Sequence, residues 1–221
     1  FLFEKTGIFL YTCFFILKIR KMELLVATHN KHKFEEIKSI IPSTFKLLSL
    51  NDINFNKEIE EPYLTIEENA LHKAKTLYAL TGMNIIADDT ALEIEALYNK
   101  PGVFSARFAG ENCSYKDNIN KVLTLMKDKN NRKAKFRTII ALILNGTEYI
   151  FEGKIEGNIT KQPRGNMGFG YDPIFEPIGY NKTFAEMSSD EKNKISHRYI
   201  ALNNLMEFLN NYLQNFNNEN I

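Results

Sequence analysis

The sequence predicts an α/β fold in which helices cover a mixed sheet and two lobes face each other across a cleft. Strand-like and helix-like segments alternate over residues 23–97, as they do when strands are joined by helices. Two long strand-like segments then flank Asn145-Gly146, a strong short signal for an antiparallel hairpin. Parallel and antiparallel pairs together make a mixed sheet, and no linker or internal repeat divides the chain.

The first elements are predicted from apolar spacing and from residues that begin or end helices. Asn30 is expected to cap a helix that Pro42 ends. Thr65 begins a second helix through the capping-box pattern T-I-E-E, and Gly82 ends it. Strands are expected at residues 23–28 and 45–50, followed by an acidic, irregular segment at 51–63.

Residues 84–97, N-I-I-A-D-D-T-A-L-E-I-E-A-L, place two adjacent acids between two strand-like runs. The runs are expected to be separate strands, so that Asp88 and Asp89 lie where a strand leaves the core, as ligand-binding groups often do. Adjacent residues of an extended chain point to opposite faces. One acid is therefore expected to face a site and the other a structural partner; the alternative is a polar turn with two solvated acids.

The second half continues with a helix at residues 115–128 and a hairpin of strands at 135–144 and 147–159. A glycine-rich segment follows at 162–172, and a short helical piece is expected at 180–187. The chain is expected to end in one long helix over residues 188–216, whose apolar side chains recur at helical spacing.

Composition limits the classes of function. The chain has 221 residues, ordinary apolar content and a net charge of +1, so no nucleic-acid partner is indicated. Two cysteines without metal-binding spacing fit a reducing compartment, and we expect the cytoplasm. Residues 1–21 are interpreted as an upstream extension and residues 22–221 as the domain. The alternative is that residues 1–21 anchor the protein to a membrane or a partner. The apolar run at 8–17 is too short to span a bilayer, and no membrane partner is expected.

Residues 27–33, A-T-H-N-K-H-K, are candidates for binding phosphate because they join a strand to a helix. Free N–H groups at a helix N-terminus attract anions, and Thr28 and Asn30 add polar side chains. Lys33 in the first turn opposes the helix dipole, which a bound phosphate would explain. The alternative is an ordinary cap followed by a solvated basic turn.

Acidic side chains supply candidate ligands for Mg²⁺, which binds through one or two carboxylates together with phosphates and water. An acid of the Asp88–Asp89 pair together with Glu60 or Glu61 would suffice. Glu67 and Glu68 open a helix, and we expect them to serve its cap and dipole.

Two later segments are candidates for binding a base. In residues 165–172, G-N-M-G-F-G-Y-D, glycines permit close approach of the backbone, and Phe169 and Tyr171 offer rings for stacking. On one continuous helix, Lys192 would share a face with Ser196. The planar guanidinium of Arg198 can donate to two acceptors at once. The alternatives are a core turn and, for His197, a structural histidine.

Together these motifs resemble the ITPase family, the pyrophosphatases of non-standard purine nucleoside triphosphates. The resemblance covers most of residues 22–213, and the motif order is that of the family. Two departures are Ala91, where the family often has Gly, and residues 1–21, which have no counterpart. The matching segments are A-T-H-N-K-H-K (27–33), I-A-D-D-T-A-L (86–92), P-G-V-F-S-A-R-F-A-G (101–110), G-F-G-Y-D-P (168–173) and E-K-N-K-I-S-H-R (191–198).

The resemblance implies a long central sheet, a nucleotide-binding cleft and usually a homodimer. It also implies Mg²⁺-dependent cleavage of ITP, dITP and XTP to the monophosphate and pyrophosphate. Asp89 would be the general base and a metal-linked acid, Glu61 or Glu60 the second metal ligand, and Lys33 would stabilise the departing pyrophosphate. A donor such as Arg198 aimed at O6 would reject ATP. The substrate-binding residues implied are Thr28, His29, Asn30, Lys31, His32, Lys33, Thr90, Phe169, Gly170, Tyr171, Asp172, Lys192, His197 and Arg198.

Three other functions are compatible with parts of the sequence. A Maf-like pyrophosphatase would share fold and reaction but prefer other nucleotides; residues 28–33 lack the arginines of its first motif. A nucleotide-binding protein without turnover would not need Asp89, Glu61 and Lys33 together. A nucleic-acid-binding module would need more positive charge than this chain carries.

Overall fold

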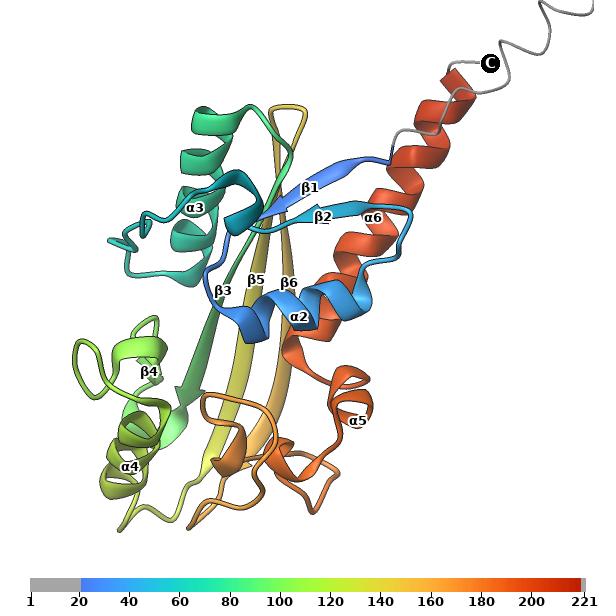
Figure 1. Ribbon diagram of the computed structural model, residues 1–221. Helices are drawn as coiled ribbons and strands as arrows, with labels where there is room; N and C mark the ends of the chain where they lie inside the picture. The colour runs from blue at the N-terminus through green and yellow to red at the C-terminus, as the bar shows by residue number, and fades with distance from the viewer. Residues whose placement is uncertain (1–20, 220–221) are drawn as a thin grey trace, which may run out of the picture.

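A computed structural model describes residues 21–219, with side chains described up to residue 214. A seven-stranded mixed sheet has the order β2-β1-β3-β5-β6-β7, with β4 also on β3 (Figure 1). The expected mixed sheet with covering helices is confirmed. The extension expected at residues 1–21 lies almost wholly outside the described part of the chain. The strands are β1 (Glu23–Val26), β2 (Lys46–Leu48), β3 (Ile85–Ile94), β4 (Lys100–Gly102), β5 (Lys133–Leu144), β6 (Thr147–Ile159) and β7 (Phe175–Pro177).

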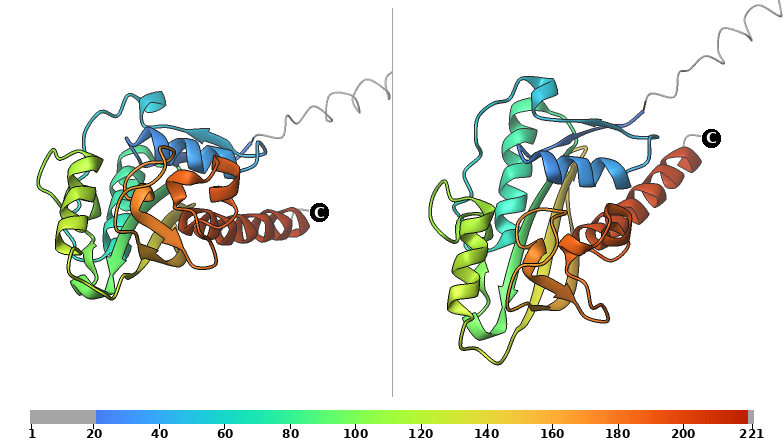
Figure 2. Two further views of the ribbon diagram at one scale, coloured as in Figure 1. Left: turned by 90° about the horizontal axis from the view of Figure 1, so that it is seen from below. Right: turned by 60° about the horizontal axis from the view of Figure 1, so that its bottom comes forward.

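Helices cover both faces of the sheet (Figures 1 and 2). Helix α3 (Ile66–Thr81) packs on the face that carries Ile85 and Ala87, whereas α2 (Lys31–Ile40) and α6 (His197–Glu219) pack on the face that carries Ile86. A second lobe at the lower end in Figure 1 contains α4 (Tyr115–Leu125) and the short helix α5 (Ser189–Asn193). Five short 3₁₀ turns complete the described part: Asn51–Ile53, Glu95–Leu97, Ser105–Arg107, Asp172–Ile174 and Phe184–Glu186.

Strand β3 is one continuous strand, so the prediction of two strands with acids at a strand end is wrong. β3 pairs with β5 along its whole length, and Asp88 and Asp89 lie opposite Ile140 and Ile139 in its middle. Aspartate disfavours strands, but here long-range ion pairs with side chains of other elements hold the carboxylates. Ala91, the departure from the glycine that is frequent in the family, is buried within this strand.

The other edge of β3 is open at its centre. β1 pairs with β3 only at Ile85 and Ile86, and β4 pairs with it only from Leu92 to Ile94. The described residues therefore provide no strand partner on this edge over residues 87–91. The buried carbonyl of Asp88, in this unpaired stretch, accepts a hydrogen bond from Lys73 Nζ at 2.7 Å. At this gap the cleft is lined by Asp89 and Thr90 of β3, and by Lys73 from one face of the sheet and Lys33 and Arg198 from the other.

The predicted helix starts are confirmed. Asn30 Oδ1 accepts hydrogen bonds from the N–H groups of His32 and Lys33 at 3.0 and 3.4 Å, and Thr65 Oγ1 accepts one from Glu68 N at 3.2 Å. Gly82 ends α3 with φ +66°. The helical piece expected at residues 180–187 is only a 3₁₀ turn, Phe184–Glu186.

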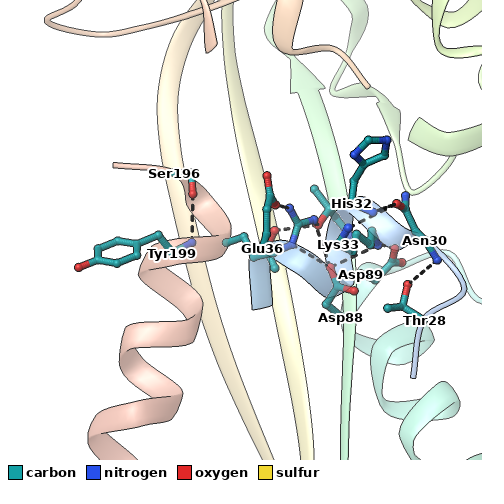
Figure 3. A network of polar contacts seen from close by, with 12 residues as sticks. Thr28, Asn30, His32, Lys33, Glu36, Asp88, Asp89, Ser196 and Tyr199 are labelled. Atoms are coloured by element: carbon teal, nitrogen blue, oxygen red, sulfur yellow. Dashed lines mark hydrogen bonds and ion pairs between the residues drawn. The ribbon is translucent and has the colours of Figure 1, made fainter. Parts of the chain in front are cut away.

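The single long helix expected from residue 188 is wrong, because the chain breaks it between α5 and α6. The Ser188 side chain caps α5, and Ser196 Oγ accepts from Tyr199 N at 3.1 Å to begin α6 (Figure 3). Serine is one of the residues preferred at the N-cap of a helix. The break means that Lys192 and Ser196 do not share a helix face as predicted. No helix among residues 21–219 is both long and apolar enough to cross a membrane.

The start of α6 lies against β6 at Gly153. A Cβ on Gly153 would lie 2.1 Å from His197 O and 2.4 Å from Ala201 N, which are backbone atoms. Only glycine therefore lets α6 approach the sheet closely enough to bring His197 and Arg198 to the cleft.

We expect Gly153→Ala to lower the free energy of unfolding by about 1–3 kcal/mol, because the added methyl group forces α6 away from the sheet. Urea unfolding followed by circular dichroism measures the change. Lys154→Ala, at an exposed neighbour on the same strand, is the control and should stay within about 0.5 kcal/mol of the wild type. An unchanged urea midpoint for Gly153→Ala would contradict the packing argument.

Candidate active site

A cleft of about 400 Å³ lies between the two lobes and contains most of the predicted site residues. Its walls come from the β1–α2 turn, β3, α3, the segment before α4, residues 169–172 and the break between α5 and α6. Of the predicted substrate-binding residues, all but Lys31 and His32 line this cleft. Lys31 is exposed, and the His32 ring instead stacks on Phe169, with ring centroids 5.3 Å apart.

The β1–α2 turn presents polar groups at the start of a helix. Asn30 N donates to Thr28 Oγ1 at 3.1 Å, while Asn30 Oδ1 caps α2. Lys33 extends from the first turn and its Nζ lies 3.3 Å from Asp88 Oδ2. His29 is tied to the next segment through a hydrogen bond with Lys57 O at 3.0 Å. The turn thus offers a phosphate the Thr28 hydroxyl, the Lys33 charge and the positive end of the α2 dipole.

Asp88 is the structural acid of the pair (Figure 3). Its Oδ2 accepts hydrogen bonds from Arg198 Nε and Nη2, both at 3.2 Å, in addition to the Lys33 contact. Burial by itself would raise the pKa of this carboxyl, but Lys33, Arg198 and Lys73 together hold the pKa far below its usual range. Asp88 is therefore ionised whenever the protein is folded near neutral pH.

Asp89 points to the opposite face, toward α3. Its Oδ1 accepts from Thr90 N at 2.9 Å and lies 4.0 Å from Lys73 Nζ, whereas its buried Oδ2 has no hydrogen-bond partner among the described residues. Burial raises the pKa of this carboxyl, and the attraction of Lys73 and Lys33 offsets that only in part. A raised pKa and an unsatisfied oxygen in a cleft are properties of a catalytic base.

Glu61 shares Lys73 with Asp89. Lys73 Nζ lies 2.6 Å from Glu61 Oε1, and Arg107 Nη1 lies 3.7 Å from Glu61 Oε2. Glu60 is exposed and does not line the cleft, so Glu61 is the member of this pair placed near Asp89.

The residues present fit a magnesium ion. No group of three or more acidic, histidine or cysteine side chains gathers as a metal site within the described chain. Mg²⁺, however, needs only one or two carboxylates when phosphates and water complete its shell. Glu61 and Asp89 supply two carboxylates beside the phosphate-binding turn, and the unpartnered Asp89 Oδ2 is an oxygen that a cation would satisfy.

The opposite end of the cleft is rigid and partly aromatic. Asp172 Oδ2 accepts from Phe169 N at 2.8 Å and from Lys192 Nζ at 2.7 Å. Gly168 has φ +74°, and a Cβ there would lie 2.1 Å from that carboxylate oxygen, so the loop requires glycine at this position. Lys192 Nζ lies 5.0 Å from the centroid of the Phe169 ring. Tyr171 is buried and its hydroxyl donates to Ser105 O at 2.8 Å, so its side chain ties two loops together.

His197 and Arg198 complete this end. The His197 ring stacks on Phe136, with centroids 4.5 Å apart and planes 16° apart, and its Nδ1 has no described partner. Burial, and then the neighbouring cations Arg198 and Lys192, lower the pKa of His197 well below its usual value, so the ring is neutral. Arg198 donates to Asp88, to Thr90 Oγ1 at 3.1 Å and to Glu36.

Lys73 and Glu36 are charged residues with ion pairs in the site that were not predicted from the sequence. Lys73 lies on the apolar face of α3 between Ala70 and Leu77, and a lysine within an apolar stripe was the signal available. Glu36 binds both Lys192 Nζ, at 2.9 Å, and Arg198. Its spacing of three residues from Lys33 puts both on one side of α2, but nothing local indicates its distant partners.

Comparisons with known proteins agree on one family. The model of the Ham1 family matches residues 24–208. The chain is 50% identical over 188 residues to a dITP/XTP pyrophosphatase of Christiangramia forsetii, covering 85% of this chain and 99% of that protein. It is 47% identical over 191 residues to the dITP/XTP pyrophosphatase of Bacillus subtilis, covering 85% and 96%. A solved HAM1 protein from Coxiella burnetii matches with a TM-score of 0.80 and 38% identity, covering 86% of this chain and 99% of that chain.

The neutral, buried His197 should make stability depend on pH. Its folded pKa lies below the unfolded value of about 6.5, so the unfolded chain binds the proton first and stability falls as pH falls below about 6.5. His197→Phe keeps the ring stacking but cannot bind this proton. We expect its free energy of unfolding to fall by about 1 kcal/mol less than that of the wild type between pH 7 and pH 5.5. Chemical unfolding at each pH measures this, and His72→Gln is the control. Equal pH slopes for His197→Phe and the wild type would show that His197 has the same pKa in the folded and unfolded states, against the lowered folded pKa.

Proposed function

Because the chain belongs to the Ham1 family, we infer that it hydrolyses non-standard purine nucleoside triphosphates, among them dITP and XTP, to the monophosphate and pyrophosphate. The family membership bears out the resemblance to the ITPase family. The observation that carries the assignment is the buried, unpartnered Asp89 Oδ2 beside Lys73 and opposite a phosphate-binding helix start. The activity removes non-standard nucleotides from the pool of polymerase substrates.

Asp89 acts as the general base in this proposal. A carboxylate with a raised pKa can orient a water molecule and take its proton as the water attacks the α-phosphorus. Lys33 and the positive end of the α2 dipole stabilise the negative charge on the departing pyrophosphate. Lys73 lies between the carboxylates of Glu61 and Asp89, and its positive charge offsets the repulsion between them in this buried site.

We further propose that Glu61 and Asp89 hold Mg²⁺ together with the triphosphate. When bound, the ion supplies neutralisation of phosphate charge and orientation of the reacting group. Lys73 and Arg107 contact the Glu61 carboxylate at 2.6 and 3.7 Å and hold it in place. Burial alone would raise the pKa of this carboxyl, but Lys73, and then Lys33 and Arg107, keep it lowered, so Glu61 is available as an anionic ligand.

The base is selected by the rigid end of the cleft. Four hydrogen bonds link Arg198 to Asp88, Glu36 and Thr90, which leaves one Nη1 hydrogen of the guanidinium without a described partner. That donor suits the 6-oxo group of hypoxanthine or xanthine and opposes the 6-amino group of adenine. The Phe169 ring lies in the same wall and supplies apolar contact for the purine.

Asp89→Asn should lower kcat for dITP and XTP by about 10²–10⁴-fold, because the amide cannot accept the proton. Pyrophosphate release from a panel of ITP, dITP, XTP, GTP, ATP and pyrimidine triphosphates with Mg²⁺ measures both this loss and the specificity, and chelation by EDTA should abolish release. The control is Asp190→Asn, at an exposed acid of α5. Near wild-type turnover by Asp89→Asn would exclude it as the base. No release from any nucleotide by the wild type would favour a non-hydrolytic binding protein.

We also propose a cytoplasmic homodimer, since nucleotide pools are cytoplasmic and the family resemblance implies a dimer. Exposed large apolar side chains such as Leu64 and Ile178, 78% and 62% accessible, are compatible with a covered surface. Light scattering after size-exclusion chromatography should give about twice the chain mass of 25.6 kDa. A monomer mass at every concentration would contradict this proposal.

A further inference from the structure

Tyr115, the first residue of α4, reaches into the cleft from the second lobe. It lines the same cavity as Thr28, Lys33 and Asp89, and 43% of its surface is accessible. Its hydroxyl oxygen accepts a hydrogen bond from Asn30 Nδ2 at 3.2 Å, across 85 residues of sequence. Neither the proposed chemistry nor the selection of the base uses this side chain.

The hydrogen bond leaves the phenolic proton of Tyr115 available. Asn30 Oδ1 is occupied by the cap of α2, because it accepts from His32 N and Lys33 N, and this fixes the amide with Nδ2 toward Tyr115. An amide N–H can only donate, so the Tyr115 oxygen is the acceptor in this contact. Its own O–H then points to another acceptor, and no described residue supplies one.

The support under Tyr115 is rigid. Ser114 and Asp117 form a capping box at the start of α4, with Ser114 N donating to Asp117 Oδ2 at 2.9 Å. Asn118, which is buried, holds the preceding loop through Ala109 N at 2.7 Å and Ala106 O at 3.0 Å. The side chain is thus presented by a fixed helix start.

We propose that the Tyr115 hydroxyl donates a hydrogen bond to the phosphate chain of the bound nucleotide, which makes Tyr115 a substrate-binding residue contributed by the α4 lobe. The inference rests on the proposed function. The phosphate chain is favoured over the base because the hydroxyl lies at Asn30, the cap of the anion-binding helix start. The ring centroid of Phe169, at the base end, is 6.1 Å from that of Tyr115, with the planes tilted by 45°, so the two rings do not stack.

Tyr115→Phe removes only the hydroxyl and tests the contact. We expect KM for dITP and XTP to rise about tenfold, as on loss of a hydrogen bond to a charged group, with kcat within about twofold of the wild type. Inorganic tripolyphosphate, which has neither sugar nor base, is the probe for the phosphate chain. Its dissociation constant, measured by calorimetry with Mg²⁺, should rise by the same factor as KM.

Tyr98→Phe is the matched control, because Tyr98 is 93% accessible and lies outside the cleft. It should leave KM and tripolyphosphate binding unchanged. Unchanged tripolyphosphate binding by Tyr115→Phe would overturn the proposal, whether or not KM for the nucleotides changed. The calorimetry also separates this inference from the proposed function: absence of turnover by the wild type would reject the function, whereas tripolyphosphate binding would still report on Tyr115.

Discussion

Two adjacent buried carboxylates at the centre of a sheet are the constraint on which this structure depends. Asp88 and Asp89 point to opposite faces of β3, and an unpaired buried charge costs several kcal/mol. Each covering helix therefore contributes a cation: α2 supplies Lys33 and α6 supplies Arg198 on one face, and α3 supplies Lys73 on the other. The helices that build the core are thus fixed in place by the same groups that form the cleft.

The fold could be predicted where local signals determine it. The Asn145-Gly146 turn with its two strands, and the helix starts at Asn30 and Thr65, depend on residues close in sequence and are as predicted. β3 was wrongly divided, because an Asp-Asp pair is stable inside a strand only when cations from distant helices reach it. The break before α6 depends on Ser196 as a cap and on the close contact of His197 with Gly153, which is equally non-local.

The site could be predicted in part for the same reason. The motif segments identify most of the residues that line the cleft, including Asp89, Lys33 and Arg198. The choice between Glu60 and Glu61, and the recruitment of Glu36 and Tyr115, required the tertiary structure, because their partners lie in other elements. His32 shows the opposite failure: it belongs to a motif, yet its ring leaves the cleft and packs on Phe169.

The ion pairs also explain how the cleft can accept a triphosphate without leaving a buried charge unpaired. Asp88 has two cationic partners, Lys33 and Arg198, and the second is bound through two nitrogens. Lys33 can therefore turn to a phosphate while Arg198 still neutralises Asp88. Arg198 in turn is held by Glu36, which also binds Lys192 at the base end. Lys33 can thus leave Asp88 for a phosphate at one end of the cleft while Arg198 keeps the geometry of the other end. This is possible because two different residues neutralise Asp88.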